Sequence, residues 1–221
     1  RFSQEWGNSE LRLDLVILAV RVLLVSANLY GKVYTNLGET LKHALFQVSS
    51  IMTTTGYSTA NFDTWPSFSK GILFALMFVG GSAGSTAGSV KVIRLLVAGK
   101  VLKREIARTI HPQVATPMTI DGRPIPPEVV QGVASFYLLY FAVFISGTLL
   151  ISLEGIDLFS AMSAVAATLG NIGPGFGAVG PTQTFALFSP ASKLFFSFLM
   201  LLGRLELFSL FVVFTPSFWR E

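Results

Sequence analysis

The feature that most constrains this chain is a set of four apolar segments, each near the length that crosses a lipid bilayer. Such a crossing needs roughly 20 consecutive apolar residues. The segments lie at 11–30, 71–98, 129–151 and 192–214. Only 13% of the 221 residues are charged, whereas an ordinary soluble domain carries about 25%. The sequence therefore predicts an all-α polytopic membrane protein, and the absence of Cys excludes a disulfide framework.

Two of these segments contain residues that a simple membrane span avoids. The run GGSAGSTAGS interrupts the second segment at 80–89, and each glycine in a helix costs about 1 kcal/mol relative to alanine. The first segment contains Asp14 and Arg21. These two stand seven residues apart and share a helix face, so they can pair or point into the protein interior. We expect a broken helix at 80–89 and assign no role to Arg21.

Two shorter apolar segments, at 40–52 and 155–167, lie between the predicted spans. They are too short to cross a bilayer and are typical of re-entrant elements. Each ends in a small, polar stretch that contains glycine, TTTGYST at 53–59 and TLGNIGPGFG at 168–177. Both therefore resemble a short helix that enters the membrane and returns as an extended loop.

An offset of 114 residues aligns the two glycine-containing stretches. It sets Gly56 against Gly170 and Thr54 against Thr168. We interpret the chain as an internal duplication whose unit is an outer helix, a re-entrant pore helix, an extended filter loop and an inner helix. The expected organisation is a first unit at 1–100, a basic linker at 101–128 and a second unit at 129–221.

The charges of the connecting segments orient the two units. From 91 to 128 there are seven Lys and Arg against three Asp and Glu, while the connections around the short segments have balanced charge. Lys and Arg concentrate in cytoplasmic loops of membrane proteins. We therefore expect the linker and the C-terminus to be cytoplasmic, and both filter loops to open toward the outside.

The composition of the two loops suits a bare monovalent cation. Rings of backbone carbonyls replace the hydration shell of such an ion when the chain is held extended around an axis. Glycine at positions 56 and 170 permits φ values that strain other residues, and the sequence Thr54-Thr55-Gly56-Tyr57 resembles the core of potassium-channel filters. Helix-terminating loops of ordinary function have the same residue types, and this alternative stays open.

Three longer motifs carry a family resemblance. FQVSSIMTTTGYST at 46–59, GGSAGSTAGSVKVIR at 80–94 and LLGRLELFSLFVVFTPSFWR at 201–220 together resemble the C-terminal half of the bacterial TrkH/KtrB potassium-transport subunits, in the Trk/Ktr/HKT superfamily. That family has four outer helix, pore loop and inner helix repeats around one pore. The resemblance implies that this chain holds the third and fourth repeats, and that the first two belong to a preceding part of a longer protein.

The resemblance also implies which residues act. It implies an intramembrane gating loop beneath the filter and an arginine, Arg204, that faces the permeation path. The implied selectivity filter is Thr54, Thr55, Gly56, Tyr57, Thr168, Leu169, Gly170 and Asn171. The implied gate is Gly80, Gly81, Ser82, Ala83, Gly84, Ser85, Thr86, Ala87, Gly88 and Ser89.

The same resemblance implies the partners and the location of the protein. It predicts K⁺ uptake in the bacterial inner membrane, with lipid and the missing half of the subunit as neighbours. It implies a homodimer on a cytosolic ring of nucleotide-binding regulators of the TrkA or KtrA type. No cofactor is expected in this chain, nor any nucleic-acid partner, and no catalytic residues are expected because no nucleophile and base pair is visible.

Several competing interpretations remain open from the sequence. A secondary transporter with broken helices at a midplane site is the main alternative, and 80–89 could instead be a small-residue packing surface. The run GFGAVG at 175–180 matches a dinucleotide fingerprint in its letters, but no strand precedes it. His43 and His111 are isolated, and the basic stretch 100–108 suits either a membrane surface or a docking site.

Overall fold

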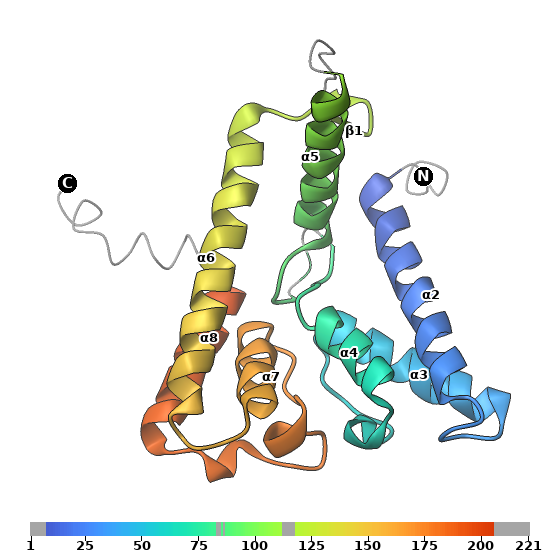
Figure 1. The fold of residues 1–221 in the computed structure, drawn as a ribbon, viewed down its shortest axis with the longest axis vertical. Coiled ribbons are helices and arrows are strands. Elements are labelled where there is room, and N and C mark those ends of the chain that lie inside the picture. Colours follow the sequence, from blue (N-terminus) through green and yellow to red (C-terminus); the bar gives the residue numbers. More distant parts are fainter. Residues whose placement is uncertain (1–7, 83–84, 86, 112–117, 206–221) are drawn as a thin grey trace.

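The computed structural model describes residues 8–82, 85, 87–111 and 118–205, and within them the chain is almost entirely helical (Figure 1). The helices are α2 (Ser9–Leu29), α3 (Leu37–Met52), α4 (Ser67–Leu76), α5 (Val92–Ile110), α6 (Pro127–Ser152), α7 (Leu158–Leu169) and α8 (Pro190–Arg204). Three short 3₁₀ turns, Phe62–Thr64, Gly177–Val179 and Phe185–Leu187, lie in the connections, and β1 (Thr119–Ile120) pairs antiparallel with β2 (Arg123–Pro124). The predicted all-α fold with two helix, re-entrant helix and helix units is confirmed.

The helices α2 and α6 are the outer helices of the two units. Within the described ranges, α6 alone is both long enough and apolar enough to cross a membrane by length and composition. The helix α2 has 21 residues but contains four charged side chains within its length. The helix α8 extends to Arg204. The last part of the span predicted at 192–214, residues 206–214, falls outside the described residues.

The re-entrant helices α3 and α7 are fixed at their N-termini by side-chain caps. The Asn36 side chain accepts a hydrogen bond from the Gly38 N–H at 2.9 Å, and Asp157 accepts one from the Ser160 N–H at 2.9 Å. Such caps stabilise a helix by about 1 kcal/mol. From Ser160 onward α7 is almost wholly buried and rich in Ala and Ser, because it packs against both α6 and α8.

The inner helix of the first unit is interrupted over a longer stretch than 80–89. The helix α4 ends at Leu76 and α5 begins at Val92. The two ends of the interruption are joined, since the Gly80 N–H donates to the Val90 carbonyl at 2.8 Å. The helix α5 then continues to Ile110, so the first ten residues of the segment expected as a linker, 101–110, are helical.

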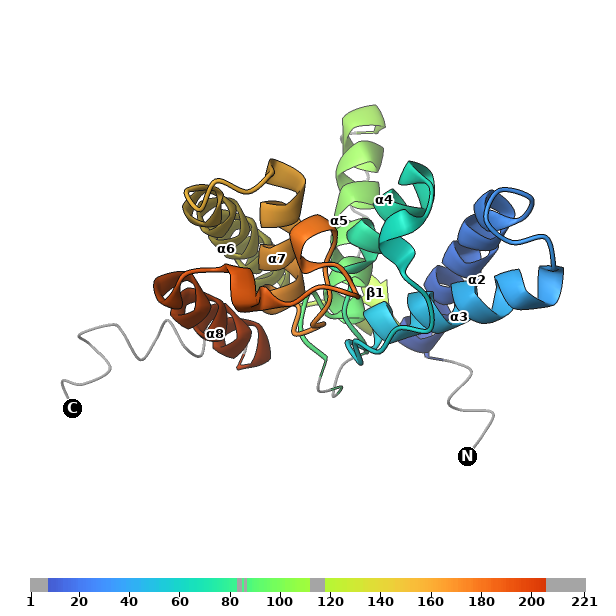
Figure 2. The ribbon, with the colours of Figure 1, turned by 90° about the horizontal axis from the view of Figure 1, so that it is seen from below.

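The two units lie side by side when viewed from below, with α6, α7 and α8 on one side and α2, α3 and α4 on the other (Figure 2). Aromatic side chains join them beside the returning loops. The rings of Phe62 and Phe176 pack edge to face at 5.2 Å between centroids, and Phe74 packs on Phe159 at 5.4 Å. The carboxylate of Asp63 also accepts a hydrogen bond from the Gly177 N–H at 3.2 Å. The loops of the two units are therefore held at a common centre.

The connection after α6 contains a carboxylate whose ionisation stabilises the fold. Hydrogen bonds from the Ser189 and Ser192 hydroxyls hold the pKa of Glu154 below its usual value of 4.5. A carboxylate with a lowered native pKa contributes stability that is complete above the unfolded pKa and is lost as the pH falls through the native pKa.

We predict that the melting temperature of the complete subunit falls below about pH 4.5, and that part of this fall is absent in Glu154→Gln. Thermal unfolding in detergent between pH 3 and 7 measures it. The control is Glu128→Gln, at the exposed start of α6. Identical pH profiles for wild type and Glu154→Gln would contradict this role.

Candidate functional site

The C-terminal ends of α3 and α7 have the same backbone geometry. The residue that follows α3, Thr53, has φ −83° and ψ 0°, and the residue that follows α7, Gly170, has φ −80° and ψ −9°. Two residues later, the N–H of Thr55 donates to the Ser50 carbonyl and that of Ile172 donates to the Ala167 carbonyl, both at 2.8 Å. The structural register between the units is therefore 117 residues.

The register of 114 predicted from the sequence is wrong for these loops. The structural counterpart of Gly56 is Gly173, with φ +78° and +107°, respectively. The φ of Gly170 is −80°, which any residue adopts, so the conformational reason given for that glycine does not hold. Thr168 and Leu169 lie in the last turn of α7, and the Thr168 hydroxyl donates to the Ala164 carbonyl at 2.8 Å.

Gly170 is instead required by close packing. A Cβ added there would lie 2.5 Å from the Ser89 Oγ and 2.9 Å from the Ala166 carbonyl oxygen. Both distances are shorter than real Cβ contacts. Gly170 thus lets Ser89, in the interruption between α4 and α5, approach the end of α7.

Every second residue of each loop has a left-handed conformation. In the first loop these are Thr54 at φ +54° and Gly56 at +78°, and in the second Asn171 at +54° and Gly173 at +107°. In a regular strand successive carbonyls point to opposite sides, and alternating left-handed residues remove this alternation. For the β-branched Thr54 the conformation costs on the order of 1–3 kcal/mol, and such strain collects at functional sites.

A further feature of these loops is the hydrogen bonding of their backbone carbonyls. Among the described residues, none donates a hydrogen bond to a carbonyl of 53–56 or of 170–173. The next carbonyl of the first loop, that of Tyr57, accepts a hydrogen bond from the Ser50 hydroxyl at 2.6 Å. Of these eight residues, Gly170 and Ile172 are buried and the other six are at least partly accessible. Unpaired carbonyls that face a common axis can coordinate an ion.

The two loops touch. A Cβ added to Gly56 would lie 2.1 Å from the Ile172 carbonyl oxygen and 3.3 Å from the Pro174 ring. Tyr57, which the sequence assigned to the filter, is 73% exposed. The structure therefore places Gly56 of the first loop against Ile172 and Pro174 of the second loop.

Polar side chains that the sequence analysis missed hold the loops in place. Ser163, buried in α7, bonds both the N–H and the carbonyl of Phe176, and Ser160 accepts from the Ala178 N–H at 2.9 Å. In the first unit the buried Gln47 amide lies against the backbone of Ala60. A serine within an apolar helix does not by itself indicate a contact with a loop. The sequence offered only the distance between each serine and the loop that follows.

The described part of the predicted gate lies against the second loop. A Cβ added to Gly88 would lie 2.3 Å from the Gly170 carbonyl oxygen, and the Ser89 hydroxyl donates to the Met77 carbonyl at 2.6 Å. Ser82 donates to the Asp14 carboxylate of α2 at 3.3 Å. Of the predicted gate, Ala83, Gly84 and Thr86 fall outside the described residues.

Arg204 lines a cavity of about 220 Å³ beside this segment. The lining residues are Ser85, Ala87, Ser89, Lys91, Arg94, Phe136, Tyr140, Leu202, Gly203 and Arg204. The Arg94 guanidinium lies 4.0 Å from the centre of the Phe136 ring. Three cationic side chains thus border the cavity where Gly88 and Gly203 approach the end of α7.

The other motifs take structural places. The run 175–180 contains a 3₁₀ turn, and the two-stranded hairpin lies elsewhere, so within the described ranges this run does not join a strand to a helix. His43 stacks on Tyr34 at 5.1 Å and shares a hydrogen bond with Thr59. Among the described residues, no three His, Cys, Asp or Glu side chains gather in a way that could hold a metal ion.

Comparison with known proteins decides the family. The model of the TrkH family, described as cation transport protein, matches residues 12–221. The chain belongs to the TrkH family. The Trk system potassium uptake protein TrkH of Salmonella typhimurium is 39% identical over 217 residues, which are 98% of this chain and 44% of the relative. The TrkH of Halomonas elongata is 36% identical over 221 residues, all of this chain and 45% of the relative.

A solved structure agrees with these sequence relatives. The crystal structure of the potassium transporter TrkH from Vibrio parahaemolyticus superposes with a TM-score of 0.89 at 38% identity, over 97% of this chain and 46% of that one. The chain therefore spans less than half the length of the curated relatives it matches. The relatives are named as potassium uptake proteins, which are transporters rather than enzymes.

We predict that Gly56→Ala destabilises the complete subunit more than Gly173→Ala. Both changes place a Cβ at positive φ, which costs on the order of 1–2 kcal/mol. Only Gly56→Ala also forces the Ile172 backbone to move, since an added Cβ at Gly173 meets no atom within 4 Å. Such overpacking costs a further ~1–3 kcal/mol.

Thermal unfolding in detergent at several K⁺ concentrations measures both variants. Equal losses for the two would show that the loops do not touch at Gly56. Gly71→Ala, in α4 with open space around the added Cβ, serves as control.

Proposed function

We propose that this chain is half of a channel-like pore subunit that admits K⁺ through a filter of backbone carbonyls. The observation that carries the proposal is the pair of matching loops that touch at Gly56 and Ile172 with their carbonyls unpaired. A dehydrated K⁺ needs several such oxygens at once. The names of the relatives, potassium uptake proteins, support the choice of ion.

The filter in this proposal follows the structural register. In the second loop it includes Gly170 and Asn171, already implied by the resemblance, and extends to Ile172 and Gly173. In the first loop Thr54, Thr55 and Gly56 contribute carbonyls. Thr168 and Leu169 support the filter from α7, and the partially negative C-termini of α3 and α7 favour a cation there.

The interrupted segment between α4 and α5 acts as the gate. Its described residues combine close approach to the Gly170 carbonyl with hydrogen bonds to Met77 and Asp14. Non-helical backbone at membrane depth is tolerated where it lines a cavity or is packed in protein. Arg204, on the cavity beside this segment, raises the energy of a cation there until the gate moves.

The complete protein includes partners that this chain does not contain. We infer a preceding half with two more loops, a homodimer, and a cytosolic TrkA or KtrA type ring that binds the nucleotide. The bacterial inner membrane holds the subunit, with the linker and the C-terminus on the cytoplasmic side by the distribution of Lys and Arg. K⁺ is the transported ion rather than a resident cofactor.

A transporter built from inverted repeats fits the structure less well. The two units run in the same direction, because α2 and α6 both lead into a re-entrant helix at the same end of the molecule (Figure 1). The measured K⁺ flux into proteoliposomes, with Na⁺ and Rb⁺ in competition, tests the channel-like pore directly. Slow K⁺ exchange that saturates with K⁺ concentration would favour the carrier.

We predict that deleting Ala83, Gly84 and Ser85 from the complete subunit raises K⁺ flux in the absence of the regulator, at least severalfold. The deletion leaves the joined ends of the segment in place, at Gly80 and Val90, and removes the middle part that obstructs the pore in this proposal. Flux of K⁺ into proteoliposomes measures the effect.

The control for this experiment is a deletion of equal length in the linker, at 114–116. Unchanged or reduced flux through the folded 83–85 deletion would count against a gate at 80–89. Arg204→Ala in the same assay should change the conduction rate without changing protein yield.

A further inference from the structure

A groove of about 830 Å³ runs between α2 and α5, away from the filter. Its walls are mainly apolar, with Leu13 and Val16 on α2 and Leu95, Leu96 and Leu102 on α5. Val16 and Leu102 are 56% and 63% exposed. An apolar groove between two helices is complementary to a hydrocarbon chain.

One end of the groove is cationic. Its lining includes Arg12 from α2 and Lys100 and Lys103 from α5, and no carboxylate is among its described lining residues. The two helices run in opposite directions (Figure 1), so Arg12 near the start of α2 lies at the same end as Lys103. Leu95 is eight residues before Lys103, about 12 Å deeper at 1.5 Å per residue.

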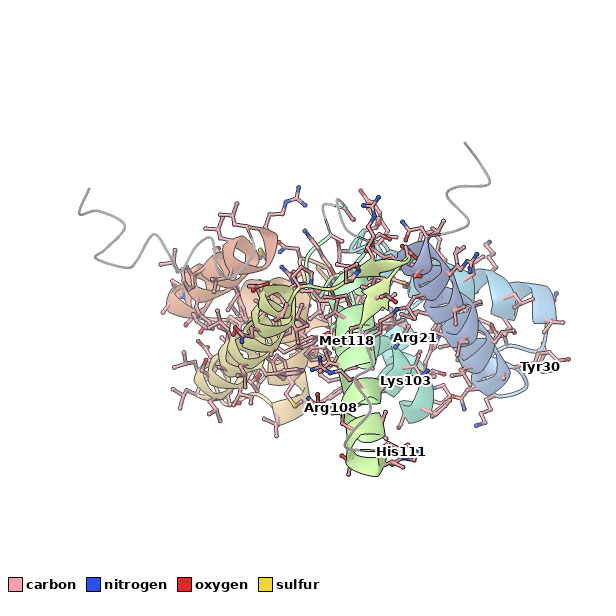
Figure 3. All side chains as sticks on the ribbon, turned by 90° about the horizontal axis from the view of Figure 1, so that it is seen from above. Arg21, Tyr30, Lys103, Arg108, His111 and Met118 are labelled. Atoms are coloured by element: carbon pink, nitrogen blue, oxygen red, sulfur yellow. The ribbon has the colours of Figure 1, made fainter. Side chains whose placement is uncertain are left out.

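The orientation of the cations fits a ligand held between the two helices. Figure 3 shows Lys103 on the side of α5 that faces α2, and Arg108 on the opposite side. The Lys100 ammonium donates to the Thr119 carbonyl, which fixes it beside the groove. Asp121 accepts hydrogen bonds from the N–H and hydroxyl of Ser9, and it attracts Lys100 and Arg12 electrostatically.

We propose that this groove binds one anionic phospholipid, with its phosphate at Arg12, Lys100 and Lys103 and an acyl chain along Leu13, Val16, Leu95 and Leu96. The described lining has three cationic side chains and no carboxylate, which favours an anionic headgroup over a zwitterionic one. The inference uses the proposed orientation, in which this end lies at the cytoplasmic leaflet, where anionic lipids meet Lys and Arg.

The lipid has a structural consequence for the pore. The helix α5 follows the interrupted segment directly, and Ser82 of that segment bonds Asp14 of α2. A lipid seated between α2 and α5 therefore rests against α5, which follows the gate segment, and against α2, which that segment contacts at Asp14.

Native mass spectrometry of the complete subunit tests the proposal. The purified protein is incubated with phosphatidylglycerol or with phosphatidylcholine of the same acyl chains, and the lipid retained is counted. We expect at least one phosphatidylglycerol retained in preference to phosphatidylcholine. Arg12→Gln and Lys103→Gln should each reduce that preference about fivefold, since each cation near a surface is worth about 1 kcal/mol.

A groove-filling variant separates this site from others. Gly99 lines the groove, and a Cβ added there meets no atom within 4 Å, so we expect Gly99→Leu to occupy part of the groove. It should lose the retained lipid of either headgroup. Gly132→Leu, at a position on α6 where an added Cβ also meets no atom within 4 Å, is the control for Gly99→Leu. Arg108→Gln is the control for Lys103→Gln.

Equal retention by wild type and Gly99→Leu would overturn the proposal, and so would equal retention of the two lipids by wild type. If the preceding half or a second subunit covers the groove, wild type and Gly99→Leu retain equal amounts of lipid. The experiment measures bound lipid, so its failure is distinct from a failure of K⁺ flux. Normal K⁺ flux with no lipid preference would reject the lipid site and leave the proposed pore unaffected.

Discussion

The structure depends on how the backbone leaves the two re-entrant helices. After α3 and after α7 the chain makes the same turn, fixed by the Thr55 N–H on the Ser50 carbonyl and the Ile172 N–H on the Ala167 carbonyl. That turn pairs most of the N–H groups but leaves the carbonyls of 53–56 and 170–173 without hydrogen-bond donors among the described residues. In the proposed filter these carbonyls replace the water that a K⁺ ion loses.

The rest of the fold keeps these two turns in contact. The small side chains of α7 let it sit between α6 and α8, and caps at Asn36 and Asp157 set where α3 and α7 begin. The Phe62–Phe176 contact and the Asp63–Gly177 hydrogen bond join the loops of the two units. Glycine at 88 and 203 then allows the gate segment and α8 to reach the carbonyls at the end of α7.

The architecture was predictable from the sequence because it rests on length and hydropathy. The segments at 40–52 and 155–167 correspond to the short helices α3 and α7, and the interruption at 80–89 lies inside the observed break between Leu76 and Val92. The register of the second loop was not predictable from glycine identity. Matching Gly56 to Gly170 overlooked that Asn171 tolerates a left-handed conformation and that Gly173 follows two residues later. The supports at Ser160 and Ser163 depend on contacts across a turn, which spacing alone does not reveal.

The most direct test of the account is the position of a heavy alkali ion in the complete subunit. Rb⁺ has the charge and nearly the coordination of K⁺ and gives an anomalous diffraction signal. The account predicts Rb⁺ peaks between the two loops, in contact with carbonyl oxygens of 54–56 and 171–173. Peaks confined to carboxylates elsewhere, or loops whose carbonyls turn away from every bound ion, would contradict it.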